Sequence, residues 1–162
     1  MLYVFVEGLD DERFFEYILR EKEIKIVEYA AMKQKKITDF IKSINAMPED
    51  DYIFSADADG DSIEQKLEKV KMHYPICDPG KIYIVQREIE SWYLAGIELG
   101  TFSSAKKKKI TNTDNVSKEE FLSMIPKNYT KILFMSEILQ RYNLSLACSR
   151  NTSLAYFAKC LL

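Results

Sequence analysis

The sequence predicts an α/β fold in which a mostly parallel sheet of about four strands carries helices on both faces. Short apolar runs typical of buried strands alternate with stretches whose apolar residues recur at helical spacing, and turn residues separate the two patterns. This alternation favours parallel pairing, because each helix returns the chain to the start of the next strand. The architecture is Rossmann-like, with a C-terminal helical extension.

Four runs form the predicted strands. Each is short and rich in Val, Ile, Tyr or Phe, as expected of strands buried on both faces. They cover Leu2–Val6, 24–31, 52–56 and 81–85.

Helices are predicted between these strands, where apolar residues form stripes at a spacing of three or four. Asp10 is placed to cap the first helix, and Asp61 with Glu64 has the spacing of a capping box before the third. Pro48 ends the second helix, and the turn sequence at 78–80 precedes the fourth strand.

Beyond the fourth strand the helical pattern resumes and then lapses. We divide the chain into an α/β core over 1–98, an exposed basic loop over 99–117, and a helical extension over 118–162 that packs on the same domain. The loop is rich in Ser, Thr and Asn and contains four consecutive lysines. Loops of this length are uncommon in compact domains and are often functional. Helices are expected at 119–125, 129–142 and 153–162.

Composition limits the function. The chain has 162 residues and a formal net charge of −2, which excludes a protein that binds nucleic acid through bulk positive charge. Three widely spaced cysteines and one histidine provide neither a disulfide framework nor a zinc or histidine-rich metal site. No apolar stretch approaches the ~18 residues of a membrane span, and the N-terminus lacks the features of a signal peptide. We therefore expect a cytoplasmic protein that does not contact membranes.

Acidic residues follow three of the predicted strands. In an open α/β sheet, ligands bind outside the carboxyl ends of the strands. Crowded carboxylates there must take up protons or find a cation, and ligand sets made only of oxygen suit Mg²⁺ or Mn²⁺. The residues concerned are Glu7 and Asp11 after the first strand, Asp57 and Asp59 after the third, and Glu88 and Glu90 after the fourth.

Some of these assignments have two readings. Asp10 and Asp11 can each cap a helix or face the site, whereas Asp61 fits a cap better than a ligand. Glu88 and Glu90 would lie about 200° apart on a helix but on the same face of a strand, and the apolar pattern does not choose between these alternatives.

Three segments together resemble the toprim fold, named for topoisomerases and primases. YVFVEGLDDERFF resembles the first motif, an apolar strand followed by Glu-Gly and a further acid. IFSADADGD resembles the second, a strand ending in Asp-x-Asp, and IYIVQREIESWYLAG is similar to the third acidic segment of nucleases of the overcoming-lysogenisation-defect (OLD) type and their small stand-alone relatives. The resemblance covers roughly residues 1–98.

The resemblance implies a role for each acid. Glu7 matches the toprim glutamate, a metal ligand or general acid/base. Asp57 and Asp59 match the Mg²⁺-binding pair. Asp11 matches the acid four residues after the glutamate, and Glu88 and Glu90 match the third motif. The chemistry implied is metal-dependent hydrolysis of a DNA or RNA backbone, with Glu7, Asp57 and Asp59 as catalytic residues, in a setting such as defence against mobile elements.

Basic residues outside the acidic set provide candidate contacts to nucleic acid. A basic loop beside a metal site would attract phosphate, and an arginine before the last predicted helix could contact it as well. The candidates are Lys106, Lys107, Lys108, Lys109 and Arg150.

Two other hypotheses stand beside the nuclease. One is a toprim module without activity of its own, which binds nucleic acid or a partner such as an ATPase, since the chain has no P-loop of its own. The other is a phosphoacceptor receiver domain, which would need a fifth strand followed by a lysine, and we find no convincing one. A homodimer is compatible with the sequence but has no specific support.

Overall fold

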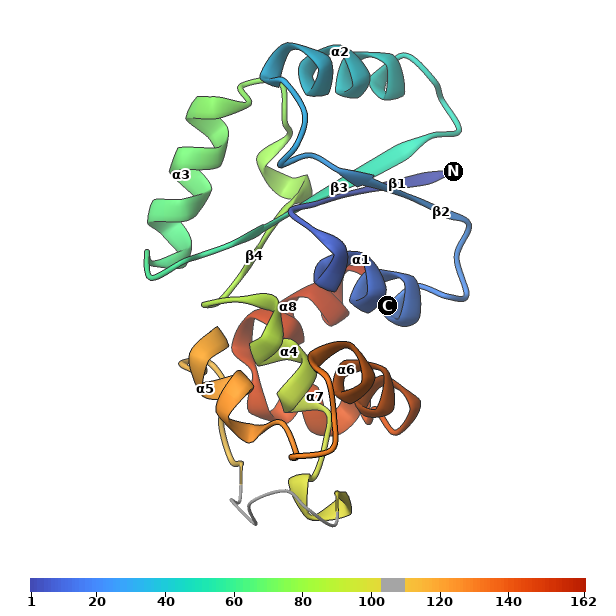
Figure 1. Cartoon of the computed structure of the whole chain (residues 1–162). Helices are drawn as coiled ribbons and strands as arrows, with labels where there is room; N and C mark the ends of the chain where they lie inside the picture. Colours follow the sequence, from blue (N-terminus) through green and yellow to red (C-terminus); the bar gives the residue numbers. More distant parts are fainter. Residues whose placement is uncertain (103–109) are drawn as a thin grey trace. The chain divides into compact units, whose positions relative to one another are not determined.

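The computed structural model describes residues 1–102 and 110–162 of the chain. These residues form two compact units, Met1–Val85 and Gln86–Leu162, which are described separately. The predicted division at residues 98 and 117 stays a prediction. The predicted fold class is confirmed, because the strands form an all-parallel sheet flanked by helices and further helices follow toward the C-terminus (Figure 1).

The first unit alternates strand and helix throughout. Its elements are β1 (Leu2–Val6), α1 (Leu9–Ile18), β2 (Ile24–Glu28), α2 (Gln34–Asn45), β3 (Asp51–Asp57), α3 (Ile63–His73), a short 3₁₀ turn η1 (Pro79–Lys81) and β4 (Ile82–Val85).

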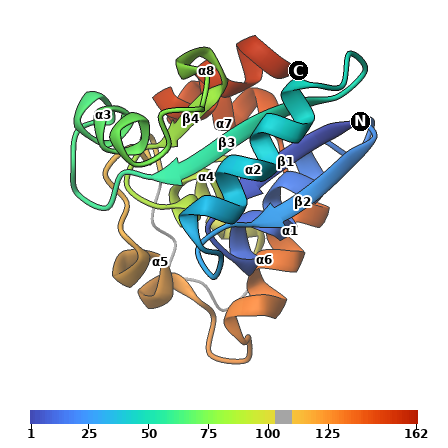
Figure 2. The ribbon, with the colours of Figure 1, turned by 90° about the horizontal axis from the view of Figure 1, so that it is seen from above.

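The four strands pair in parallel in the order β2-β1-β3-β4. The chain therefore moves from β1 to one side for β2, then crosses to the other side for β3 and β4. Since such crossovers are right-handed, the reversal puts α1 on one face of the sheet and α2 and α3 on the other, as Figure 1 shows. Seen from above, α2 runs over β1 and β3 (Figure 2).

The hydrophobic core between the sheet and α2 and α3 is rich in aromatic side chains. Phe5 from β1 and Phe54 from β3 stack with ring centroids 5.8 Å apart, and Tyr29, which follows β2, stacks on Phe54 at 4.4 Å. Alternate residues of a strand face opposite sides. Because Phe54 and Ala56 face this core, Asp57 leaves the sheet on the opposite face, where α1 lies.

The ends of several elements differ from the predicted ones by one or two residues, for example in β3, β4 and α6. The predicted cap Asp10 is wrong, because Asp10 lies inside α1 and the N-cap residue is Gly8. Two further differences concern β2 and the cap of α3. The second strand ends at Glu28, not at residue 31, because Glu28 pairs with Val6, the last residue of β1. The capping box of α3 is formed by Ser62 and Gln65, one position later than predicted, and the side chain of Asp61 pairs with a lysine of α3 instead.

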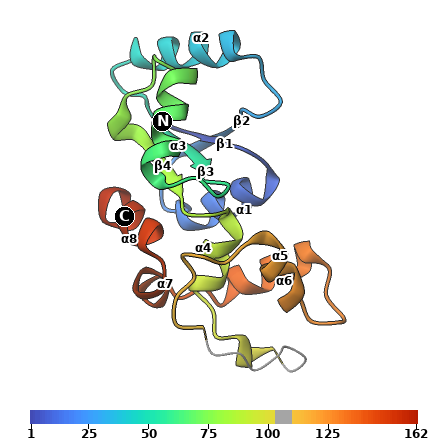
Figure 3. The same ribbon diagram turned by 90° about the vertical axis from the view of Figure 1, so that its left-hand side faces the viewer.

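The second unit is helical over its described residues. It comprises α4 (Ile89–Ala95), a 3₁₀ turn η2 (Leu99–Thr101), α5 (Lys118–Met124), α6 (Lys131–Gln140), α7 (Leu144–Arg150) and α8 (Thr152–Leu161). All seven residues of α4 are buried, and α4 contacts α5, α6 and α7. Figure 3 shows α4 with α7 on one side and α5 and α6 on the other.

Buried polar contacts join the ends of this unit. The Ser153 hydroxyl accepts the indole N–H of Trp92 at 2.8 Å and the backbone N–H of Gln86 at 3.0 Å. Gly96 lies against the ring of Tyr142, where an added Cβ would stand 2.3 Å from the nearest ring carbon. The Tyr142 hydroxyl donates to the Trp92 carbonyl at 2.7 Å. The glycine is therefore required for the close approach of α4 and the segment after α6.

Among the helices described, none is both long and apolar enough to cross a membrane.

Candidate functional site

Glu7 follows β1 directly and is bound to both neighbouring strands. Its Oε1 accepts the backbone N–H of Asp57, at the end of β3, at 3.2 Å. The same oxygen accepts the hydroxyl of Tyr29, just beyond β2, at 3.0 Å. The Tyr29 hydroxyl also lies 3.0 Å from the backbone carbonyl of Ser55. The carboxyl ends of β1, β2 and β3 thus meet at one carboxylate oxygen.

The second oxygen of Glu7, Oε2, is available to a ligand. No described residue donates a hydrogen bond to it, and it remains accessible to solvent. Glu7 is therefore oriented through one oxygen while the other is presented outside the sheet edge, the arrangement of a pre-positioned ligand or base.

Asp57 and Asp59 are separated by a tight turn after β3. The N–H of Ala58 bonds to the carbonyl of Val85, and the N–H of Asp61 bonds back to the carbonyl of Ala58 at 3.0 Å. Asp59 has φ of 51° and Gly60 has φ of 93°, both in the left-handed region. Aspartate tolerates this conformation better than most residues, and glycine does so freely. The turn brings Asp59 back toward α3.

Lys66, in the second turn of α3, joins two of these carboxylates. Its Nζ lies 3.0 Å from Asp59 Oδ2 and 3.8 Å from Glu7 Oε1. Burial disfavours the charged ammonium, but the hydrogen bond from Lys66 to Asp59 and the charges of Glu7, Asp59 and Asp57 outweigh this and raise the pKa of Lys66. A cation of the protein itself therefore lies among the predicted metal ligands.

Tyr29 is held in its neutral form by the same surroundings. Burial contributes most, followed by the charge and hydrogen bond of Glu7 and then by the charges of Asp11 and Asp57; together they raise the pKa of the Tyr29 phenol. All three carboxylates therefore lie within electrostatic range of this hydroxyl. Asp11, in the first turn of α1, is buried, whereas Asp10 pairs with Arg13 at 2.9 Å.

Glu7 contacts the Asp57 backbone and, through Lys66, is linked to Asp59, so three of the four predicted acids of the first unit are neighbours. Asp57 and Glu7 border the same sheet edge from opposite faces, and their direct contact is through the Asp57 backbone. A ligand at this edge would be reached by Glu7 from the α3 side and by Asp57 from the α1 side. Asp11 lies in the first turn of α1, the helix on that second side.

Glu88 and Glu90 belong to the second unit, and both have partners there. Glu88 precedes α4, and its Oε2 accepts the backbone N–H of Lys118 at 2.6 Å. Glu90 is buried inside α4 and pairs with Lys131 at 2.7 Å. Their assignment to the metal site stays a prediction.

The predicted nucleic-acid contacts divide into two groups. Arg150 is buried, and its guanidinium bonds to the Ile97 carbonyl at 3.0 Å and to the carboxylate of Glu98. These contacts favour a structural role for Arg150 over contact with a phosphate. The four consecutive lysines at 106–109 lie outside the described residues.

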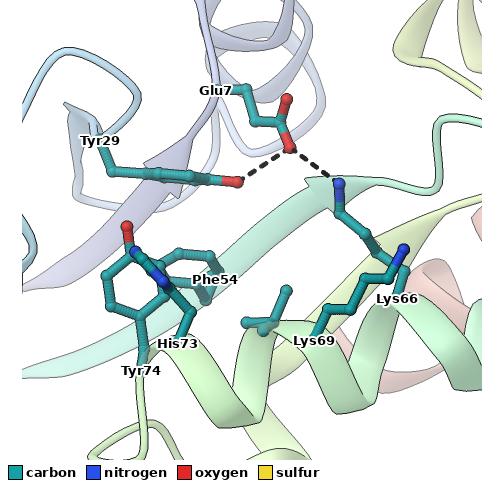
Figure 4. Close-up of a pocket in the computed structure, with 8 residues that line it drawn as sticks. Glu7, Tyr29, Phe54, Lys66, Lys69, His73 and Tyr74 are labelled. Atoms are coloured by element: carbon teal, nitrogen blue, oxygen red, sulfur yellow. Dashed lines mark hydrogen bonds and ion pairs between the residues drawn. The ribbon is translucent and has the colours of Figure 1, made fainter.

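A pocket of about 330 Å³ opens beside Glu7 on the α3 side of the sheet (Figure 4). Aromatic rings form one part of its lining and basic side chains of α3 another. The close-up shows Lys66 and Tyr29 on opposite sides of Glu7, each joined to the same carboxylate oxygen.

Sequence reasoning missed Lys66 and Tyr29. A signal existed for Tyr29, because it follows a predicted strand and so lies at the same sheet edge as the acids. Lys66 shares a helix face with Lys69 and His73, at spacings of three and seven residues. The rule that ligands bind at strand ends selects acids there, and it assigns no role to the basic residues of the following helix.

The donor set is compatible with a hard divalent cation. Glu7, Asp57 and Asp59 provide only oxygen, and Mg²⁺ is commonly bound by one or two carboxylates with water and substrate phosphate completing its shell. In the part of the chain that the structure describes, no three or more His, Cys, Asp or Glu side chains are grouped so that they could hold a metal ion. A site here would therefore use few protein ligands, and the Lys66 ammonium would have to move away from Glu7 while it stays paired with Asp59.

Comparison with protein-family models, with curated proteins and with solved structures finds no match for this chain.

Proposed function

We propose that this chain is a divalent-metal-dependent nuclease of the toprim type that hydrolyses phosphodiester bonds of DNA or RNA. The observation that supports it best is the direct link between Glu7 and the end of β3, which joins two of the three resembling motifs. Asp57 donates its backbone N–H to Glu7 Oε1 at 3.2 Å, and no described residue donates to Glu7 Oε2. Carboxylates at the carboxyl ends of inner parallel strands suit a ligand site.

In this proposal the residues of the first unit have separate roles. Glu7 and Asp57 hold Mg²⁺ or Mn²⁺, which supplies a Lewis acid that neutralises charge on the scissile phosphate and makes water a better nucleophile. Tyr29 keeps the Glu7 carboxylate in one orientation. Asp59 holds Lys66 close to the edge, where its ammonium can contact a phosphate.

The test is cleavage by the purified full chain of single-stranded DNA, plasmid and RNA, with Mg²⁺, with Mn²⁺ and with EDTA. Glu7→Gln and Asp57→Asn keep the size of each side chain and remove its charge. We expect each to lower metal-dependent cleavage by about 100-fold or more, because each removes a direct ligand. Glu68→Gln is the matched control, since Glu68 is exposed on α3 and pairs with Lys71.

Each outcome has a distinct meaning. Cleavage that persists in both variants contradicts the site. Absence of cleavage by a chain that still binds Mn²⁺ contradicts independent nuclease activity and favours the module that acts with an ATPase or another partner.

A further inference from the structure

One face of α3 presents basic side chains to the pocket beside Glu7. Lys66, Lys69, Val70 and His73 follow the spacing i, i+3, i+4, i+7, which places them on one side of a helix. Lys69 pairs with Asp61 at 2.6 Å, and His73 is exposed. This side of the pocket therefore carries two ammonium groups, one paired with Asp59 and the other with Asp61.

The opposite lining is aromatic. Tyr29 and Phe54 stack at 4.4 Å between ring centroids, and Tyr74 lies 5.2 Å from Phe54. The His73 ring meets Tyr74 edge-on at 4.5 Å. In Figure 4 these rings lie on one side of the pocket, and the ammonium groups of Lys66 and Lys69 lie on the other.

This combination selects a class of ligand. Phe54 is fully buried and Tyr29 and Tyr74 are only 9% and 8% exposed, so the exposed ring of His73 is the one placed to contact a flat aromatic group. The neighbouring ammonium groups favour an anion attached to that group. The volume of about 330 Å³ is at the small end of ligand pockets, so it suits one nucleotide and not a base pair. Base–aromatic stacking tolerates every base, because each has a π-face.

We propose that this pocket binds one unpaired nucleobase, with the phosphate of the same nucleotide directed to Lys66 and Lys69. The substrate is then single-stranded nucleic acid or an unpaired strand end, since a base within a duplex cannot enter. The link to cleavage rests on the nuclease proposed above, whereas nucleotide binding by the pocket stands on its own residues.

Binding is measured first, with ligands that contain no phosphodiester bond for a nuclease to cleave. The full ¹⁵N-labelled chain is titrated with AMP, adenosine and ribose 5-phosphate in the presence of Mg²⁺, and the amide shifts of α3 are followed by NMR. We expect AMP to shift the amides around Val70 and His73 and to bind at least about fivefold more tightly than ribose 5-phosphate, which lacks the base. Equal affinity of the two, or shifts elsewhere, would overturn the proposal.

Variants then locate the site. His73→Ala should weaken AMP binding by at least about fivefold. Met72→Ala changes an exposed neighbour on the same helix and should leave the affinity unchanged. Equal effects of the two substitutions would mean that the pocket is not the nucleotide site.

Cleavage distinguishes the two proposals. We expect a short single strand to be cleaved with a higher kcat/KM than a blunt duplex of the same sequence, and His73→Ala to raise KM for the single strand with little change in kcat. If the chain cleaves both substrates equally and binds AMP no more tightly than ribose 5-phosphate, the nuclease proposal is supported and the pocket proposal is refuted. If the chain cleaves neither substrate but binds AMP more tightly than ribose 5-phosphate, the nuclease proposal is refuted and the pocket proposal is supported.

Discussion

Replacing Lys66 by methionine tests whether the ammonium group of Lys66 competes with the proposed metal for Glu7. Lys66 lies 3.0 Å from Asp59 and 3.8 Å from Glu7, and its side chain is only 17% exposed. Methionine retains the apolar stem of lysine and removes its charge. The carboxylates would then face one another without the ammonium.

The size of the effect follows from the distances and the exposure. Two unit charges at 4 Å interact by about 4 kcal/mol at an effective dielectric constant of 20, and by about 1 kcal/mol in water. The Asp59 side chain is 55% exposed and that of Glu7 31%, so the value near water applies. We therefore assign about 1.4 kcal/mol to the interaction of Lys66 with these carboxylates, which corresponds to a tenfold change in Mn²⁺ affinity when the ammonium is removed.

We therefore expect Lys66→Met to bind Mn²⁺ about tenfold more tightly than the unchanged chain. Free Mn²⁺ is followed by electron paramagnetic resonance during a titration at moderate salt, where separations of 3–4 Å remain well inside the Debye length. In EDTA the variant should melt at a lower temperature than the unchanged chain, because carboxylate repulsion is no longer offset. Added Mn²⁺ should reverse that order by mass action.

Lys71→Met is the matched control, because Lys71 is on the same helix and pairs with Glu68. Its Mn²⁺ affinity should equal that of the unchanged chain. If Lys66→Met binds Mn²⁺ no more tightly than Lys71→Met, Lys66 does not compete for the metal position and the reasoning is wrong.

Two further predictions concern stability. Tyr29→Phe should lose stability less steeply at high pH: the raised pKa of Tyr29 stabilises the fold below its ordinary pKa of about 10, and this contribution falls by about 1.4 kcal/mol per pH unit above it as the unfolded phenol ionises. Urea unfolding at pH 8 and pH 11 measures the difference, and identical slopes for both chains would contradict it. Gly96→Ala should lower the free energy of unfolding by about 1–3 kcal/mol, because the new methyl group meets the Tyr142 ring. Gly100→Ala, which meets nothing within 4 Å, is its control in the same thermal melts, and an equal loss would remove the steric explanation.

The fold was largely predictable because its signals are local. Each strand is a short apolar run, and the alternation with helices selects a parallel sheet. The boundaries were less accurate, since they depend on partners. The end of β2 depends on where β1 stops, and the cap of α3 on which of two adjacent polar side chains reaches the backbone.

Helix α7 was missed for a related reason. The segment between 143 and 151 contains two Ser and two Asn residues, which are typical of a loop between helices. In the structure Asn143 caps α7, and Asn151 caps α8 directly after it, so the same polar residues begin two helices.

Only part of the candidate site was predictable, from the rule that ligands bind at the carboxyl ends of parallel strands. The acids Glu7, Asp57 and Asp59 follow strands, and parallel strands end at one edge. The partners of Glu88 and Glu90 lie 30 and 41 residues further along the chain, and no local sequence pattern predicts pairs so far apart.

The order of the strands also determines how firmly the site is held. β1 and β3, which end at Glu7 and Asp57, are the inner strands of the four-stranded sheet, and each has a ladder on both sides. β2, which leads to Tyr29, is an edge strand. Local opening begins at such edges. The backbone amides near Tyr29 should therefore exchange their hydrogens faster than the Asp57 amide, which is bonded to Glu7. The carboxylates of Glu7 and Asp57 are thus held by inner strands, whereas Tyr29, which orients Glu7, depends on an edge strand.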